Sequence, residues 1–110
     1  MKYGKLKIRG NQMYTDKIKL VERHIRKYLQ AKIQIESSIS NYSNRPHIVD
    51  FYRYIQYVID QLDEDSRIII FNDFMARKNR NWYLEFYSTS TYYRLKKIAI
   101  YKFVDCLEEL

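Results

Sequence analysis

The spacing of apolar residues along the chain predicts helices almost throughout. From about residue 15 to residue 37, apolar side chains recur every three or four positions, the period of one helix face. Thr15 or Asp16 is expected to cap the start of this helix. A second helix is expected from about Ile48 to Leu62, and a third over about 65–77. The side chains expected to face inward are Ile18, Val21, Ile25, Tyr28, Leu29, Ile33 and Ile35 in the first helix, Ile48, Phe51 or Tyr52, Ile55, Val58, Ile59 and Leu62 in the second, and Ile68, Ile69, Phe71, Phe74 and Met75 in the third.

Polar segments separate these helices. Residues 37–46 form the clearest loop, because their serine and asparagine side chains compete for backbone hydrogen bonds. The acids at 63–65 are expected to cap the third helix, where free amides and the positive dipole end favour negative charge. A metal-binding or catalytic use of these carboxylates is the alternative. Residues 77–81 form a short basic link to the last part of the chain.

The two ends of the chain differ in character. Residues 1–11 alternate basic and apolar positions between two glycines, which predicts a basic arm, with a short strand as the alternative. A short fourth helix is expected over about 81–86, and a fifth from about Ser90 to Leu107. With only two glycines and one proline in 110 residues, few positions break a helix. The chain is therefore predicted to be a single all-α domain of about five helices, in which residues 15–62 support a helix-turn-helix over 63–107.

Composition narrows the cellular setting. There is no run of about 18 apolar residues, so no transmembrane helix and no membrane partner are expected. The basic amino terminus lacks the apolar stretch of a signal peptide. The single cysteine, Cys106, forms no disulfide framework and is expected to be a buried small hydrophobe. These features favour a cytoplasmic protein.

The net charge of +7 is unevenly distributed. Residues 1–34 hold ten basic and two acidic side chains, residues 35–76 hold three and seven, and residues 77–110 hold seven and four. Two positive ends suit a polyanion, because neutralising phosphates releases counterions. On charge alone, ordinary solubility explains the composition equally well.

The stretch from Trp82 to Leu107 meets the demands of a helix-turn-helix, in which a short helix braces a second helix that enters the major groove. Trp82, Leu84 and Phe86 give the short helix more apolar surface than its length warrants, which indicates that it is wedged between larger helices. The hydroxyl groups of residues 88–90 can cap the helix that follows.

A helical wheel of the last helix separates two faces. The inner face is expected to hold Tyr92, Leu95, Ala99, Phe103, Cys106 and Leu107, and the outer face Ser90, Tyr93, Arg94, Lys97 and Tyr101. The outer face carries donors of the kind that contact guanine edges or phosphates, although a solvated basic face would look the same. Ile98, Ile100 and Val104 lie outside the inner face, which predicts packing on the long first helix or a homodimer surface.

The order of residues in this region resembles a known family. Matching residues are Ser88, Ser90, Thr91, Tyr92, Tyr93, Arg94, Lys96, Lys97, Ala99 and Phe103. With the upstream segment 62–69, they resemble the carboxyl-terminal end of ArpU-like phage transcriptional regulators of Gram-positive bacteria, which look like the DNA-binding region of sigma factors. The resemblance covers about 45 of the 110 residues. Many members carry a Leu-Gly pair where this chain has Phe86 and Tyr87, so the turn must differ here or Tyr87 must be strained.

The resemblance implies roles for individual residues. Ser90 would cap the recognition helix, and Thr91, Tyr93, Arg94 and Lys97 would face the groove or its phosphates. The stem of Lys96 would lie along apolar surface while its charge reaches a phosphate. Arg80, in the basic link, completes the set of DNA-binding candidates.

No other chemistry is indicated. The two histidines and the lone cysteine lack zinc-ligand spacing, and no phosphate loop or hydrolase motif is present, so neither an enzyme nor a cofactor is expected. The twelve tyrosines are expected to line the edge of the core, with stacking on single strands as the alternative. The function expected is sequence-specific binding of double-stranded DNA by a phage or prophage transcriptional regulator, with RNA polymerase as a further partner. The alternatives are a small terminase-like packaging protein and a protein-binding module that acts on RNA polymerase or another host enzyme.

Overall fold

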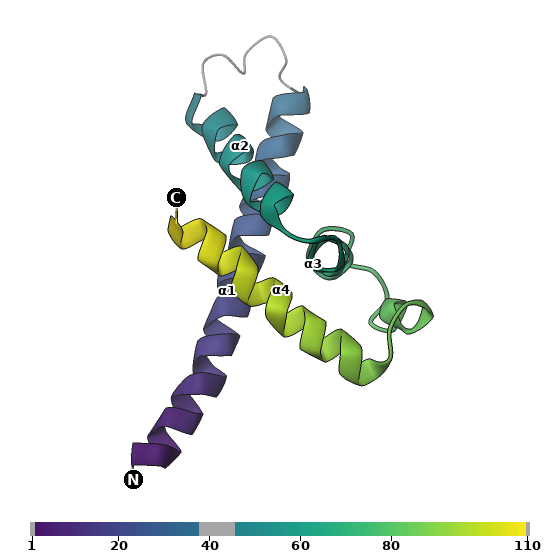
Figure 1. The fold of residues 1–110 in the computed structure, drawn as a ribbon. Helices are drawn as coiled ribbons and strands as arrows, with labels where there is room; N and C mark the ends of the chain where they lie inside the picture. The colour runs from purple at the N-terminus through teal and green to yellow at the C-terminus, as the bar shows by residue number, and fades with distance from the viewer. Residues whose placement is uncertain (1, 38–45, 110) are drawn as a thin grey trace.

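A computed structural model describes residues 2–37 and 46–109, and it describes side chains over residues 12–37 and 46–107. The α-helices are α1 (Lys2–Ser37), α2 (Pro46–Gln61), α3 (Glu64–Ile70) and α4 (Thr89–Glu109) (Figure 1). A π-helical turn, Phe71–Met75, continues α3, and a 3-10 helix, Trp82–Glu85, precedes α4. The predicted all-helical class is confirmed for these residues, which contain four α-helices because the short segment before α4 forms only a 3-10 turn. None of the described helices has the length and hydropathy needed to cross a bilayer.

The first helix begins earlier than the sequence predicted. It runs from Lys2 to Ser37, so Thr15 and Asp16 lie within it and the segment expected as a basic arm belongs to α1. Once a helix has formed, each added residue contributes a hydrogen bond, and a single glycine costs only about 1 kcal/mol relative to alanine. The amino-terminal part of α1 extends away from the other helices, and the molecule measures 56 × 37 × 21 Å (Figure 1). Most of the predicted loop at 37–46 lies outside the described residues.

The core lies where α4 crosses α1 and α2 packs beside them (Figure 1). Its buried side chains are Val21, Ile25, Tyr28, Ile55, Val58, Leu62, Ile70, Ala99, Ile100, Phe103 and Val104. Cys106 is half-buried against this cluster. The carboxyl-terminal half of α4 crosses α1, and Ile100 and Val104 in that half are buried there. Packing on the first helix, one of the two uses predicted for these side chains, therefore accounts for both.

In the first three helices of the prediction, two side chains expected to face inward are exposed. Ile33 is 64% exposed, because the buried stripe of α1 continues through Tyr28 and Ala31, on a different side of the helix. Phe71 is 52% exposed while Ile70 and Asn72 on either side are buried. Phe71 begins the π-helical turn, which holds more residues per turn than an α-helix and so shifts the facing of the residues in it.

The predicted cap of α3 is confirmed. The carboxylate of Asp63 accepts hydrogen bonds from the backbone amide of Ser66 at 3.4 Å and from its hydroxyl at 2.7 Å. The ammonium of Lys102, on α4, donates to the same carboxylate at 2.8 Å. These donors, Lys102 first, lower the pKa of Asp63 to about 2. One side chain therefore both caps α3 and ties it to α4.

Asp63 should make stability depend on acid pH. Because its pKa is lower in the folded chain than in the unfolded chain, its contribution is complete above about pH 4 and is lost as pH falls towards 2. Asp63→Asn keeps a capping oxygen but removes the charge, so its free energy of unfolding should fall below that of the native chain at pH 7 and converge with it near pH 2. The carboxylate is 46% exposed, which keeps the difference at pH 7 to about 1 kcal/mol or less. Urea unfolding at several pH values measures this, and a difference that does not change with pH would contradict it.

Candidate nucleic-acid interface

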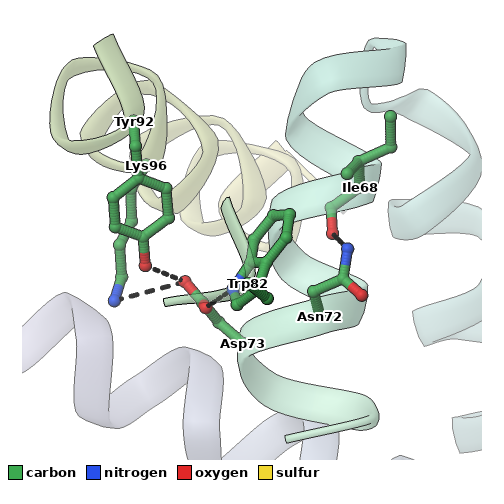
Figure 2. Close-up of polar contacts among 6 residues, drawn as sticks. All are labelled: Ile68, Asn72, Asp73, Trp82, Tyr92 and Lys96. Atoms are coloured by element: carbon green, nitrogen blue, oxygen red, sulfur yellow. Dashed lines mark hydrogen bonds and ion pairs between the residues drawn. The ribbon is translucent and has the colours of Figure 1, made fainter. Parts of the chain in front are cut away.

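The carboxylate of Asp73 joins three parts of the chain. It lies in the π-helical turn after α3 and accepts hydrogen bonds from the Trp82 indole at 2.7 Å and the Tyr92 hydroxyl at 2.6 Å. The ammonium of Lys96 pairs with it at 3.3 Å. Figure 2 shows Tyr92 and Lys96 descending from α4 onto Asp73, with Trp82 approaching from the 3-10 helix. The amino-terminal half of α4 is thereby fixed to the end of α3.

Aromatic rings pack beside this carboxylate. The ring of Tyr83 stacks on that of Tyr92 with centroids 3.8 Å apart and planes 4° from parallel. Trp82 meets Tyr92 edge to face at 6.0 Å. Together with Ile69, Tyr83 and Tyr92 form a second buried cluster, separate from the main core. Tyr92 therefore faces inward, as the helical wheel predicted.

The short helix before the turn is buried differently from the prediction. Trp82 is packed between α3 and α4 as expected, but Leu84 and Phe86 are 55% and 67% exposed. Within this 3-10 helix the buried side chain is Tyr83. Leu84 and Phe86 are left on the surface beside the start of α4.

Lys96 does not have the free charge that the sequence analysis assigned to it. Its ammonium is paired with Asp73, and its stem lies near the rings of Phe74 and Tyr92, 5.8 and 5.7 Å from the nitrogen. Burial, together with the hydrogen bond to Asp73, raises the pKa of Tyr92 above its ordinary value. Lys96 acts here as part of the internal support of α4.

The turn into α4 forms without a glycine. Among the described residues, the only non-glycine with a positive φ is Arg77, at 49°, just after the π-helical turn. Tyr87 needs no such conformation: its amide donates to the carbonyl of Tyr83 at 2.8 Å and its hydroxyl to Asp65 at 2.7 Å. Burial and the Asp65 carboxylate raise the pKa of Tyr87 to about 12. The strain considered for Tyr87 is absent, and the left-handed residue is Arg77.

Ser88, one of the three hydroxyl residues expected to cap α4, makes the cap, and Ser90, to which the resemblance assigned it, does not. The hydroxyl oxygen of Ser88 accepts a hydrogen bond from the amide of Thr91 at 3.3 Å and donates to the Thr91 hydroxyl at 2.8 Å. Since α4 begins at Thr89, Ser90 lies inside the first turn with its side chain exposed. Thr91 is engaged with the cap, so it is half-buried at the edge of the outer face. The cap leaves the hydroxyl of Ser90 available to a ligand.

The outer face of α4, defined by Ser90, Tyr93, Arg94 and Lys97, is exposed. Arg94 has no hydrogen-bond or ion-pair partner among the described residues. The ammonium of Lys97 lies over the rings of Tyr14 and Tyr101, at 5.7 and 5.9 Å. No acid occupies the first turn of α4. The face therefore presents positive charge at the positive end of the helix dipole.

A cavity of about 430 Å³ lies between α1 and the turn that follows α3. Of the predicted DNA-binding residues, it brings together Arg80, Tyr93 and Lys96. Ser90, Thr91, Arg94 and Lys97 do not line it. The predicted set is therefore divided between the outer face of α4 and the cavity, with Tyr93 beside both.

Asp73 is the residue that the sequence analysis missed. The feature that could have identified it is a single carboxylate in the stretch 68–75, which is otherwise apolar apart from one asparagine. A carboxylate in such a setting needs donors from elsewhere in the chain. Its partners lie 9, 19 and 23 positions further on, so helical periodicity alone could not identify them.

The chain was compared with family models, with curated proteins and with solved structures, and nothing matched in any of the three comparisons. The resemblance to ArpU-like regulators therefore rests on the residues of the sequence, and the function is argued from the site itself.

Replacing Asp73 should loosen the amino-terminal half of α4. Asp73→Ala leaves the Trp82 indole, the Tyr92 hydroxyl and the Lys96 ammonium without their shared acceptor, which should cost about 2–4 kcal/mol of unfolding free energy. Tyr92→Phe removes only one of the three donors and should cost about 1 kcal/mol. Urea unfolding followed by the fluorescence of Trp82, the only tryptophan, measures both. Equal losses for the two variants would show that Asp73 is not the common anchor.

Proposed function

We propose that this protein binds duplex DNA in a sequence-specific manner and regulates transcription, with the amino-terminal half of α4 as the recognition helix. The observation that carries this proposal is the exposed outer face of α4, on which Arg94 has no hydrogen-bond or ion-pair partner among the described residues. Behind that face, the same helix turn is held by the Asp73 contacts. A helix that is rigid on one side and free on the other is what entry into a major groove requires.

The residues of the outer face suit the edges of base pairs and the phosphates beside them. The guanidinium of Arg94 can donate two hydrogen bonds to one guanine. Ser90 and Tyr93 offer hydroxyl groups, and Lys97 offers an ammonium on the side nearest α1. We assign base contact to Arg94 and phosphate contact to Lys97 and Ser90.

The wider charge distribution supports a polyanionic partner. The chain carries a net charge of +7, and its described residues contain just two ion pairs, Lys96 with Asp73 and Lys102 with Asp63. Arg80 is exposed in the link before α4, and we assign it contact with the backbone of the duplex. Lys96, being paired internally, is assigned a supporting role. Binding should accordingly weaken as salt concentration rises.

The exposed side chains of Leu84 and Phe86 favour a second candidate function, contact with another protein such as RNA polymerase. Both lie beside the start of α4, so a bound protein would sit next to DNA held on the outer face. This candidate predicts that Leu84→Ser and Phe86→Ser impair association with polymerase and leave duplex affinity intact. The resemblance to phage regulators is the basis for placing the protein in a bacterial host. A packaging role is the further alternative, and it would require a ring of many subunits in solution.

Arg94→Ala should weaken duplex binding by about 1–3 kcal/mol while leaving the fold unchanged, because the side chain is exposed and has no internal partner. Arg53→Ala is the matched control: Arg53 is also exposed, but it lies on α2. Binding is measured by fluorescence anisotropy with duplexes selected from a random pool, at low salt and then at rising salt. Circular dichroism checks the fold of each variant.

Comparing the Arg94 and Arg53 variants distinguishes binding at the outer face of α4 from binding that depends only on net charge. If both variants lose the same affinity, binding follows net charge and the outer face has no special part in it. If the native chain shows no duplex affinity even at low salt, the proposed function is wrong. A loss confined to Arg94→Ala, together with a negative dependence on salt, supports it.

A further inference from the structure

The cavity between α1 and the turn after α3 adjoins the surface proposed to contact DNA, and of its lining residues only Arg80 and Tyr93 belong to that surface. Its volume of about 430 Å³ falls in the range of small-molecule sites. One wall belongs to α1, and the opposite wall consists of the π-helical turn, the link after it and the start of α4. Figure 2 shows α1 running past Asp73 and Lys96, which both line the cavity.

The charges that line the cavity favour an anion. The basic residues are Arg26 from α1, Arg77, Lys78 and Arg80 from the link, and Lys96 from α4. The acids are Glu22 and Asp73, and Asp73 is already paired with Lys96. Four basic side chains and one acid remain, all of them exposed at the rim. Three of the four cations are arginines, whose planar guanidinium groups match the oxygens of a phosphate.

The floor of the cavity favours a flat apolar group. Ile18, Leu29 and Phe74 supply apolar surface, and Tyr93, which is exposed, adds an aromatic ring. Tyr92 also lines the cavity, but it is buried and its ring is stacked on that of Tyr83. Aromatic rings favour stacking with other flat rings. The site is therefore larger than a bare anion needs, and its two halves differ in chemistry.

From these two halves we propose that the cavity binds a nucleoside monophosphate. The phosphate lies among the arginines of the rim, and the base lies over the apolar floor against the ring of Tyr93. Arg77 is placed at the rim by its left-handed backbone, with φ of 49°, a conformation that costs energy in a residue with a side chain.

Calorimetric titration of the native chain with AMP, adenosine and inorganic phosphate, without DNA, tests the proposal. AMP should bind about tenfold more tightly than either part alone, because it engages both rim and floor. The fluorescence of Trp82 should respond as well, since Trp82 contacts both Asp73 and Tyr92 in the lining. No binding of AMP, or binding no tighter than that of inorganic phosphate, overturns the proposal.

Paired variants separate the site from general charge. Arg26→Gln combined with Arg77→Gly should weaken AMP binding about tenfold, through the loss of two rim cations. The glycine also removes the strained φ, so thermal stability should not fall. Arg23→Gln combined with Arg53→Gln removes the same charge from exposed positions outside the lining and should leave AMP binding unchanged. Equal losses in the two double variants would overturn the site.

The cavity shares Arg80 and Tyr93 with the surface assigned to DNA, so AMP should lower duplex affinity. This consequence alone rests on the proposed function. Duplex anisotropy with and without AMP measures it, and the linkage must be reciprocal. Duplex binding that AMP leaves unchanged, when AMP does bind, overturns the competition. A chain that binds AMP and no duplex refutes the proposed function alone, and one that binds duplex and no AMP refutes the cavity proposal alone.

Discussion

A buried or half-buried carboxylate must be supplied with donors, and at Asp73 this requirement joins the end of α3, the 3-10 helix and the amino-terminal half of α4. Water is largely excluded from the side chain, which is 13% exposed, so its charge is stabilised by Trp82, Tyr92 and Lys96 instead. These donors come from two different elements, and both can reach Asp73 only if the 3-10 helix and α4 are placed as they are. The carboxylate thus fixes a geometry that apolar packing alone would leave adjustable, because dispersion and burial have little directional preference.

The two halves of α4 are held by different kinds of contact. The carboxyl-terminal half is buried in the main core, where Ile100 and Phe103 are fully covered by neighbouring helices. The amino-terminal half lies beyond that core and is held on one side, by the stack of Tyr83 on Tyr92 and by the Asp73 contacts. Its other side is therefore exposed without cost to stability. Support from one side is the physical reason that the helix can present a chemically varied face to a partner.

Helical periodicity predicted what depends on local spacing. It placed α2, α3, α4 and the part of α1 from about residue 15 onward, together with the Asp63 cap and the opposite directions of Tyr92 and Tyr93, because each follows from 3.6 residues per turn or from neighbours within one turn. It missed the start of α1 at Lys2, where a basic arm was predicted. Its predictions failed where the number of residues per turn differs from that of an α-helix. The π-helical turn shifts Phe71 outward, and the 3-10 helix sends Tyr83 inward while Leu84 becomes exposed. Periodicity could not identify the partners of Asp73, because no spacing rule links residues from separate elements.

The pairing of Lys96 with Asp73 also determines how charge is distributed around α4. Were Lys96 free, its ammonium would add positive charge between the cavity rim and the outer face. Because Asp73 neutralises Lys96, positive charge remains in two separate places, at the cavity rim around Arg77 and on the outer face around Arg94. Tyr93 lies at the border between them. A ligand in the cavity that contacts the ring of Tyr93 would therefore touch a residue of the outer face, and no conformational change is needed to link the two sites.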